Sequence, residues 1–218
     1  MTPWALYFSG VAAVIFAGLM VLQGVWIDPS GNLGTETYRH AALDIVRREA
    51  QRAKGHPAVL ALVIGNELDP VRVVQAGLQE TESLLRAAAQ IVKETDPNRL
   101  VSYANWPWLS ALDHSMWDVV SFNVYPYEPV SVSHTFCYQG YVEHLKRTAS
   151  RGKPLIVTEL GLSVSPKGGA KPGYGGNSLE QQAQGVVQLW NAAFEAGAQG
   201  ACVFERNDEW RKRGEAAG

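Results

Sequence analysis

The alternation of short apolar runs with longer polar stretches constrains the fold of this chain most strongly. Strands that are buried on both faces have continuous apolar sequences, and their strict alternation with helices is typical of a parallel sheet covered by helices. The sequence therefore predicts an α/β fold with six strands. The predicted strands are Leu19–Asp28, Val59–Gly65, Leu100–Asn105, Asp118–Tyr125, Lys153–Glu159 and Gly200–Phe204.

Helices are predicted between these strands. Gly55 and Pro57 follow the first helical stretch, as expected for a glycine C-cap and a proline stop. Ser178, with acidic and amide residues in the next turn, is a good N-cap for the last helix. The predicted helices are residues 35–54, 75–94, 108–113, 139–150 and 178–196.

A closed barrel and a doubly wound open sheet both fit this alternation. No glycine-rich phosphate loop of the GxGxxG or Walker type follows any strand, which weakens the nucleotide-binding version. The chain has 218 residues, whereas a complete (β/α)₈ barrel usually needs about 250. We therefore predict a TIM-type (β/α)₈ barrel that is incomplete, with about six recognisable β/α units.

The N-terminal segment is harder to interpret. Residues 1–27 carry no charge, which is long enough for a membrane span. Because this segment runs into an apolar strand that ends at Asp28, a membrane association is the less favoured interpretation. Residues 1–18 remain an unassigned apolar segment, and the sequence predicts no localisation.

Polar side chains gather at the carboxyl ends of the predicted strands. In a parallel α/β barrel all these ends open on one face, where active sites are built. Any single member could instead be a helix cap or a loop hydrogen bond. The set comprises Asn66, Glu67, Asn105, Trp106, Asn123, Tyr125, Glu159, Glu205 and Asp208.

Tryptophan placement supports a sugar-binding cleft. Aromatic faces can stack on sugar rings, although each tryptophan taken alone is better explained by core packing. Those near the ends of apolar runs are Trp26, Trp106, Trp108, Trp117 and Trp210.

Glu67 and Glu159 each end an otherwise apolar strand. Cleavage of a glycosidic bond needs one protonated carboxyl group to assist the leaving oxygen and one ionised carboxylate opposite it. A separation of ~5–5.5 Å gives retention of configuration, and ~6.5–9.5 Å gives inversion through a water molecule.

Three motifs make a resemblance specific. Residues 64–67 (IGNE), 122–126 (FNVYP) and 153–159 (KPLIVTE) resemble the retaining β-glycosidases of clan A, in particular the barrels of glycoside hydrolase families 2, 5 and 17. The resemblance implies that Glu67, at the end of the family's strand 4, is the acid/base. It implies that Glu159, at the end of strand 7, is the nucleophile.

The same resemblance suggests roles for neighbouring residues. Tyr125 would hydrogen-bond the nucleophile, Asn66 would contact the sugar 2-hydroxyl, and Trp210 would form a sugar platform. The remaining expected substrate-binding residues are Asn123, Trp106 and Trp26.

The chain departs from the family at its N-terminus. Only about eighteen residues precede the family's strand 3, so strands 1 and 2 are not recognisable. We expect one barrel domain over residues 1–218, truncated at its N-terminal side. An open barrel leaves an unpaired edge, so self-association through that edge is expected, and a catalytically incompetent fragment or carbohydrate-binding module is the alternative.

The expected activity is a retaining β-glycoside hydrolase or transglycosylase acting on a β-glucan-like or other β-linked oligo- or polysaccharide. The formal net charge of −2 gives no reason to expect a nucleic-acid partner. No cofactor or metal is implied. In a third interpretation the two glutamates are metal ligands, but the five histidines lie away from the strand ends.

Overall fold

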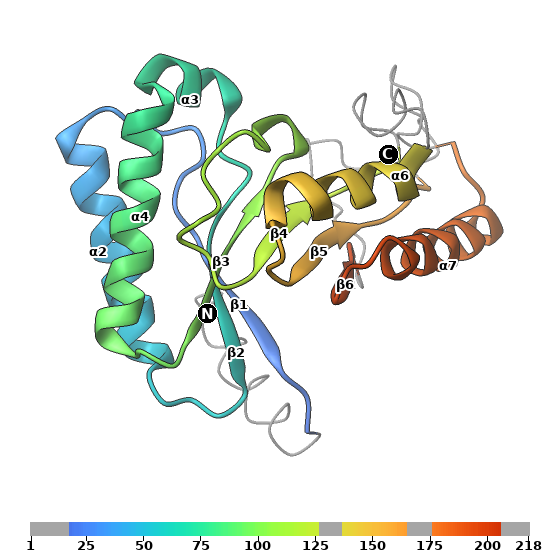
Figure 1. The fold of residues 1–218 in the computed structure, drawn as a ribbon, viewed down its shortest axis with the longest axis horizontal. Coiled ribbons are helices and arrows are strands. Elements are labelled where there is room, and N and C mark those ends of the chain that lie inside the picture. The colour runs from blue at the N-terminus through green and yellow to red at the C-terminus, as the bar shows by residue number, and fades with distance from the viewer. Residues whose placement is uncertain (1–17, 127–136, 165–175, 206–218) are drawn as a thin grey trace, which may run out of the picture.

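The computed structural model describes residues 18–126, 137–164 and 176–205. A six-stranded parallel sheet runs through them in the order β1-β2-β3-β4-β5-β6. The sheet curls into a half barrel with the helices outside it (Figure 1), which confirms the predicted incomplete barrel. The strands are β1 (Val21–Val25), β2 (Val59–Asn66), β3 (Leu100–Asn105), β4 (Val120–Asn123), β5 (Leu155–Leu160) and β6 (Gly200–Val203).

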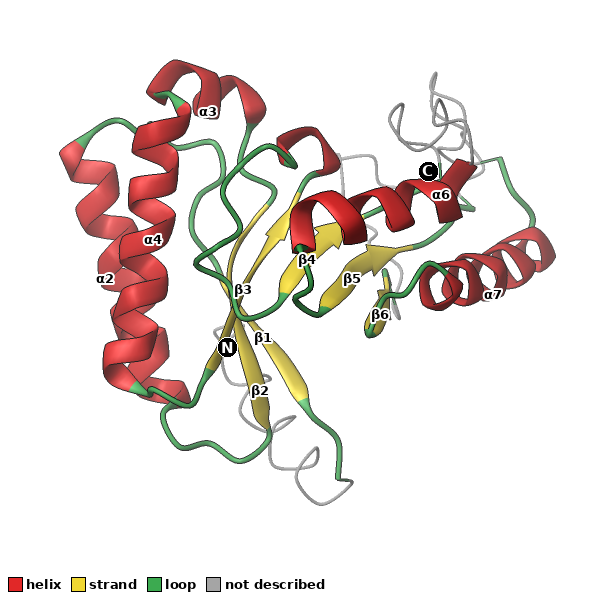
Figure 2. Cartoon of the chain, in the orientation of Figure 1, coloured by secondary structure: helices red, strands yellow, loops and turns green. Residues whose placement is uncertain are grey.

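The helices cover the outer face of the sheet in two groups (Figure 2). Helices α2 and α4 lie side by side near β1, β2 and β3, and α6 packs on α7 near β5 and β6. The helices are α2 (Glu36–Ala53), α3 (Pro70–Ala76), α4 (Leu78–Thr95), α6 (Cys137–Leu145) and α7 (Leu179–Glu195), with a 3₁₀ turn η1 (Pro107–Leu109) and a π-helical turn η2 (Lys146–Ser150).

Local chemistry explains where these helices begin. The Thr35 side chain accepts a hydrogen bond from the Tyr38 N–H at the start of α2. The predicted cap at Ser178 is confirmed, because its hydroxyl accepts from Gln181 while the Gln181 side chain accepts from the Ser178 N–H. Such reciprocal capping satisfies two amides that otherwise have no partner.

Two helix predictions were wrong in detail. Residues 75–94 do not form one helix, because Gly77 has a φ of 88° and separates α3 from α4. The helix predicted at residues 108–113 is only the turn η1. Further along, Asp113 accepts hydrogen bonds from the Ser115 N–H and hydroxyl, a local pattern that competes with helix formation.

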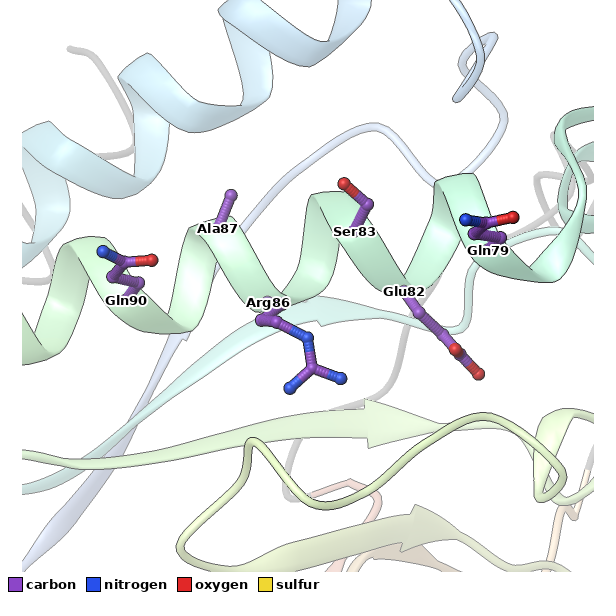
Figure 3. Close-up of a pocket in the computed structure, with 6 residues that line it drawn as sticks. All are labelled: Gln79, Glu82, Ser83, Arg86, Ala87 and Gln90. Carbon is purple, nitrogen blue, oxygen red and sulfur yellow. The ribbon is translucent and has the colours of Figure 1, made fainter.

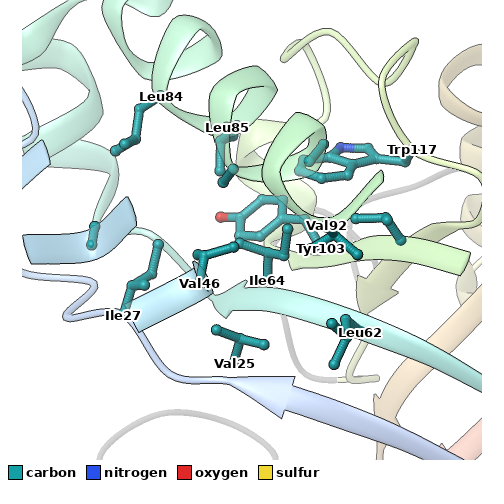
Figure 4. Close-up of a cluster of buried hydrophobic side chains, with 14 of the residues drawn as sticks. Val25, Ile27, Val46, Leu62, Ile64, Leu84, Leu85, Val92, Tyr103 and Trp117 are labelled. Carbon is teal, nitrogen blue, oxygen red and sulfur yellow. The ribbon is translucent and has the colours of Figure 1, made fainter. Parts of the chain in front are cut away.

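Two hydrophobic clusters hold the helices on the sheet. One cluster joins β1, β2 and β3 to α2 and α4 (Figure 4), and the other joins β4 and β5 to α6 and α7. In β1 and just after it, Val25 and Ile27 are 1% and 2% exposed and face the first cluster, whereas Trp26 between them is 63% exposed. This alternation places Trp26 on the opposite face, toward the inside of the half barrel.

The expectation of fully buried strands was wrong at the two edges. Leu19 and Met20 before β1 are 60% and 54% exposed, and Val203 in β6 is 44% exposed. The reason is topological, since β1 pairs only with β2 and β6 pairs only with β5 among the described residues. None of the helices in the described ranges combines the length and the hydropathy needed to cross a bilayer.

Candidate active site

The backbone around Glu67 adopts an unusual conformation. Gly65 and Glu67 have φ values of 74° and 46°, in the left-handed region that costs a non-glycine residue about 1–3 kcal/mol. The Glu67 N–H donates to the Ala104 carbonyl at 2.9 Å, and the Leu68 N–H donates to the Tyr103 hydroxyl at 3.0 Å. Strand β3 therefore holds the chain on both sides of the Glu67 peptide.

Asn123, at the end of β4, contacts the side-chain carboxylate of Glu67. Its Nδ2 donates to Glu67 Oε1 at 2.9 Å and to Asn66 Oδ1 at 3.0 Å. Its Oδ1 accepts from the Thr158 hydroxyl at 2.7 Å. Asn123 is only 1% exposed, so its amide links β2 to β5 through a buried contact.

Glu159 lies on β5, next to Thr158. Its Oε2 accepts from the Tyr125 hydroxyl at 2.6 Å, a length typical of a charge-assisted hydrogen bond. The Cα of Glu159 pairs with that of Asn123 across a register irregularity in the β4–β5 ladder. The structure therefore brings five of the expected site residues, Asn66, Glu67, Asn123, Tyr125 and Glu159, into one connected set.

Three residues near this set were missed by sequence reasoning. The sequence gives no indication of a role for Thr158 apart from its position before Glu159, and it predicts Tyr103 only as part of an apolar strand. Burial, and to a lesser extent the Glu67 charge, raise the pKa of Tyr103, against the Leu68 hydrogen bond. Burial and then the charge of Glu159 raise the pKa of the Cys202 thiol, which places Cys202 near that carboxylate.

The tryptophans expected near a sugar-binding cleft differ in how exposed their side chains are. Trp26 is exposed on the inner side of the half barrel, and Trp106 is half-buried, with an indole N–H that has no partner among the described residues. Trp117 was wrong as a cleft residue: it is 2% exposed and packs 6.1 Å from the Tyr103 ring centroid in the core. Trp210 and Asp208 lie outside the described residues.

A hollow of about 390 Å³ lies elsewhere, on the outer side of α4. Its residues come from one helix, and Glu82 and Arg86 project from the same side (Figure 3). Both have structural partners, because Arg86 pairs with Asp113 Oδ2 at 2.6 Å and Glu82 accepts from the Asp113 N–H. The hollow contains none of the strand-end residues, so it is not the candidate active site.

The described residues contain no group of three or more histidine, cysteine, aspartate or glutamate side chains placed to hold a metal ion. The chemistry that this set offers is that of two carboxylates. One accepts a hydrogen bond from the Asn123 amide of β4, and the other accepts from a phenol that follows β4.

Comparison with known proteins agrees with this architecture. Residues 21–197 match the family model of the glycosyl hydrolases family 2, TIM barrel domain. No curated protein matches the sequence. Many solved structures match the fold.

Three solved structures illustrate the likeness. A GH2 β-galacturonidase from Eisenbergiella tayi bound to galacturonate is 20% identical with a TM-score of 0.68, over 94% of this chain and 37% of that one. A β-galactosidase from the psychrophilic Marinomonas ef1 is 15% identical with a TM-score of 0.69, over 93% and 47%. A Bacteroides uniformis β-glucuronidase 2 covalently bound to cyclophellitol-6-carboxylate aziridine is 16% identical with a TM-score of 0.64, over 89% and 24%.

At such identities the structural likeness shows the fold alone. The chain spans less than half the length of each of these three proteins.

Proposed function

We propose that this chain, which belongs to the family 2 glycosyl hydrolases through their TIM barrel domain, is a retaining β-glycoside hydrolase with Glu67 as acid/base and Glu159 as nucleophile. One observation carries the proposal: Glu67 follows β2 and Glu159 lies near the end of β5 in the same parallel sheet, and Asn123 at the end of β4 contacts both the Glu67 carboxylate and Thr158, the residue before Glu159. Carboxyl ends of barrel strands are where such enzymes place their reacting groups.

The proposed reaction has two steps. In the first step, Glu159 attacks the anomeric carbon while Glu67 gives its proton to the departing glycosidic oxygen. This step leaves the sugar attached to Glu159 as a glycosyl ester. Glu67, now ionised, takes a proton from water, and the water oxygen displaces Glu159 from the anomeric carbon. The Tyr125 hydroxyl supports this by stabilising the ionised form of Glu159. The reaction needs no metal and no cofactor.

The proposed substrate is a β-linked oligo- or polysaccharide. The residues proposed to line the sugar-binding site are Asn66, Trp26, Trp106, Trp210, Asn123 and Tyr125. Of the β-linked sugars, a β-glucan-like glycan was the expectation from sequence. The similar solved structures are named for uronides and a galactoside, so these sugars belong in the test as well.

The test is to incubate the purified chain with aryl β-glucosides, β-galactosides, β-glucuronides, β-galacturonides and β-glucan oligosaccharides. A 2-fluoro glycosyl fluoride of any sugar that is turned over should trap an adduct on Glu159, identified by mass spectrometry of peptides. Glu159→Gln should abolish turnover and labelling. Glu36→Gln, whose side chain is 84% exposed at the start of α2, should retain both.

A carbohydrate-binding module without turnover is the second candidate, and the six-stranded extent of the sheet within the described residues favours it. A folded, monodisperse chain that binds a glycan but turns over none of the panel would support this candidate and contradict the hydrolase. We further propose that residues 1–218 belong to one glycoside hydrolase barrel domain, because a single sheet connects both hydrophobic clusters in the part of the chain that the structure describes.

Self-association through the open edge is also proposed. Edge strands with exposed apolar residues, such as Val203 at 44% exposure, are templates for pairing with another chain. Light scattering across a concentration series should show oligomers that Val203→Lys disrupts. The control Leu179→Lys, at a residue 74% exposed in α7, should leave them intact. A monomer at every concentration would contradict this proposal.

A further inference from the structure

The amide of Asn123 has one favourable orientation. On one side it faces two oxygen atoms, Asn66 Oδ1 and Glu67 Oε1, at 3.0 and 2.9 Å. With Glu67 ionised and Asn66 oriented as here, a flipped amide would direct Oδ1 at both of them and leave three acceptor oxygens facing one another without a proton. On the other side, the Thr158 hydroxyl can rotate its proton toward Oδ1, and it lies 2.7 Å away.

In this arrangement both N–H groups and the Oδ1 of the Asn123 amide form hydrogen bonds with other side chains of the protein. Its two N–H donors serve Asn66 and Glu67, and its Oδ1 accepts from Thr158. With 1% of its surface exposed, the residue has no N–H donor left for a sugar hydroxyl.

We propose that Thr158 and Asn123 form a positioning relay, in which the Thr158 hydroxyl fixes the Asn123 amide so that it donates to Glu67 and Asn66. Thr158 precedes Glu159 on β5, so the relay ties the acid/base carboxylate to the strand that carries the nucleophile. Neither residue reacts with substrate in this scheme. The relay deepens the proposed function and rests on it for the role of Glu67 as acid/base.

The relay has an electrostatic consequence. A hydrogen bond donated to a carboxylate favours its ionised form, so loss of the ordered Asn123 donor raises the pKa of Glu67. The titratable groups around this region are Tyr103 on β3, Tyr125 after β4, Glu159 on β5 and Cys202 on β6. Thr158→Val alters none of them and keeps the shape of the side chain.

The direct test is a carbon-13 NMR titration of the chain labelled at its glutamate side chains, with the Glu67 signal identified by its loss in Glu67→Gln. Thr158→Val should raise the Glu67 pKa by about half a unit to one unit. Thr158→Ser keeps the hydroxyl and should titrate like the parent chain. An unchanged Glu67 pKa in folded Thr158→Val would overturn the relay.

Asn123→Asp gives a second, independent readout. It keeps an oxygen for the Thr158 hydroxyl but places a second carboxylate beside Glu67, so the Glu67 pKa should rise further than in Thr158→Val. An unchanged pKa in this variant would also overturn the relay.

The titration needs no turnover and therefore stands apart from the proposed function. If no glycoside is cleaved by the parent chain while the titration behaves as expected, the hydrolase proposal fails and the relay geometry stands. If glycosides are cleaved and the titration is unchanged, only the relay fails. In an active chain, Thr158→Val should also move the basic limb of kcat/KM to higher pH and Thr158→Ser should not, because Glu67 acts when protonated.

Discussion

Single residues decide how the two carboxylates are presented. Glu67 projects from a left-handed backbone position at φ 46°, which Ala104 and Tyr103 hold through hydrogen bonds to the backbone. Glu159 lies in β5 beside register irregularities in the pairing with β4 and β6, and its Oε2 accepts from the Tyr125 hydroxyl at 2.6 Å. The proposed acid/base therefore combines a left-handed backbone position with a contact from the Asn123 amide, whereas the proposed nucleophile accepts a hydrogen bond from a phenol.

Tyr125→Phe should lower kcat/KM, because it removes a hydrogen bond to the proposed nucleophile Glu159. Loss of a hydrogen bond to an ionised group costs about 1.5–3 kcal/mol, which corresponds to roughly a tenfold or larger loss in kcat/KM. Without this donor the pKa of Glu159 rises, and because Glu159 acts when ionised, the acidic limb of the kcat/KM profile should move to higher pH.

The control for this prediction is Tyr38→Phe. It removes a hydroxyl that donates to the Asp28 carbonyl at 2.6 Å, away from the carboxylates. This variant should lose stability without moving the acidic limb. An acidic limb that stays in place in Tyr125→Phe would show that the phenol does not tune Glu159.

Among the elements, β5 and β6 approach each other closely just beyond their ends. Gly161 follows β5, and a Cβ added there would lie 2.3 Å from the Phe204 carbonyl oxygen. This oxygen belongs to the backbone, so relieving the clash would require a displacement of the main chain. The Phe204 N–H donates to the Leu160 carbonyl at 2.8 Å, so the same approach carries a ladder hydrogen bond. Glycine at 161 thus allows β6 to pair closely with β5.

Gly161→Ala should therefore destabilise the β5–β6 pairing. We expect a lower midpoint of urea unfolding and faster amide hydrogen exchange in β6 than in β2. Gly24→Ala is the matched control, because an added Cβ in β1 meets nothing within 4 Å. Equal midpoints for the two variants would contradict this explanation.

Across the whole molecule, buried and half-buried charges join the ends of separate elements. Arg99, 8% exposed, donates to the Ala53 carbonyl at 2.9 Å and to Asp96 at 3.2 Å, which ties the end of α2 to the end of α4. Asp113 accepts from Ser115 and Arg86, which ties the loop after β3 to α4.

These contacts predict a loss of stability in acid. Hydrogen bonds from the Ser115 side chain and backbone, together with Arg86 and against burial, lower the pKa of Asp113 to about 2. Because the pKa is lower in the folded state, the stabilisation is present above the unfolded value of about 3.9 and is lost as pH falls toward about 2.

Urea unfolding at pH 7, 4, 3 and 2 tests this expectation. Asp113→Asn should be less stable at pH 7 and should lose less stability than the parent chain between pH 4 and pH 2. Asp44→Asn, at a side chain that is 61% exposed and paired with Arg47 one helical turn away, should follow the parent chain. Parallel curves for Asp113→Asn and the parent would exclude this role of Asp113.

The sequence by itself determined the order of the elements and the position of the chemistry along them. Continuous apolar runs identify strands because both faces of a parallel strand are covered, and this signal held for β2, β3 and β4. The same reasoning places Glu67 and Glu159 at strand ends, since parallel strands share one polarity. Hydrogen-bonding side chains at Thr35 and Ser178 marked helix starts because capping is a local interaction.

Only the tertiary structure decided what those ends contact. Whether Trp26 or Trp117 is buried depends on which face of the sheet carries helices, and no local pattern contains that information. Exposure of β1 and β6 follows from the absence of a second neighbouring strand among the described residues. The relay from Thr158 through Asn123 to Glu67 joins residues 35 and 56 positions apart, so only the register of the four strands from β2 to β5 brings them together.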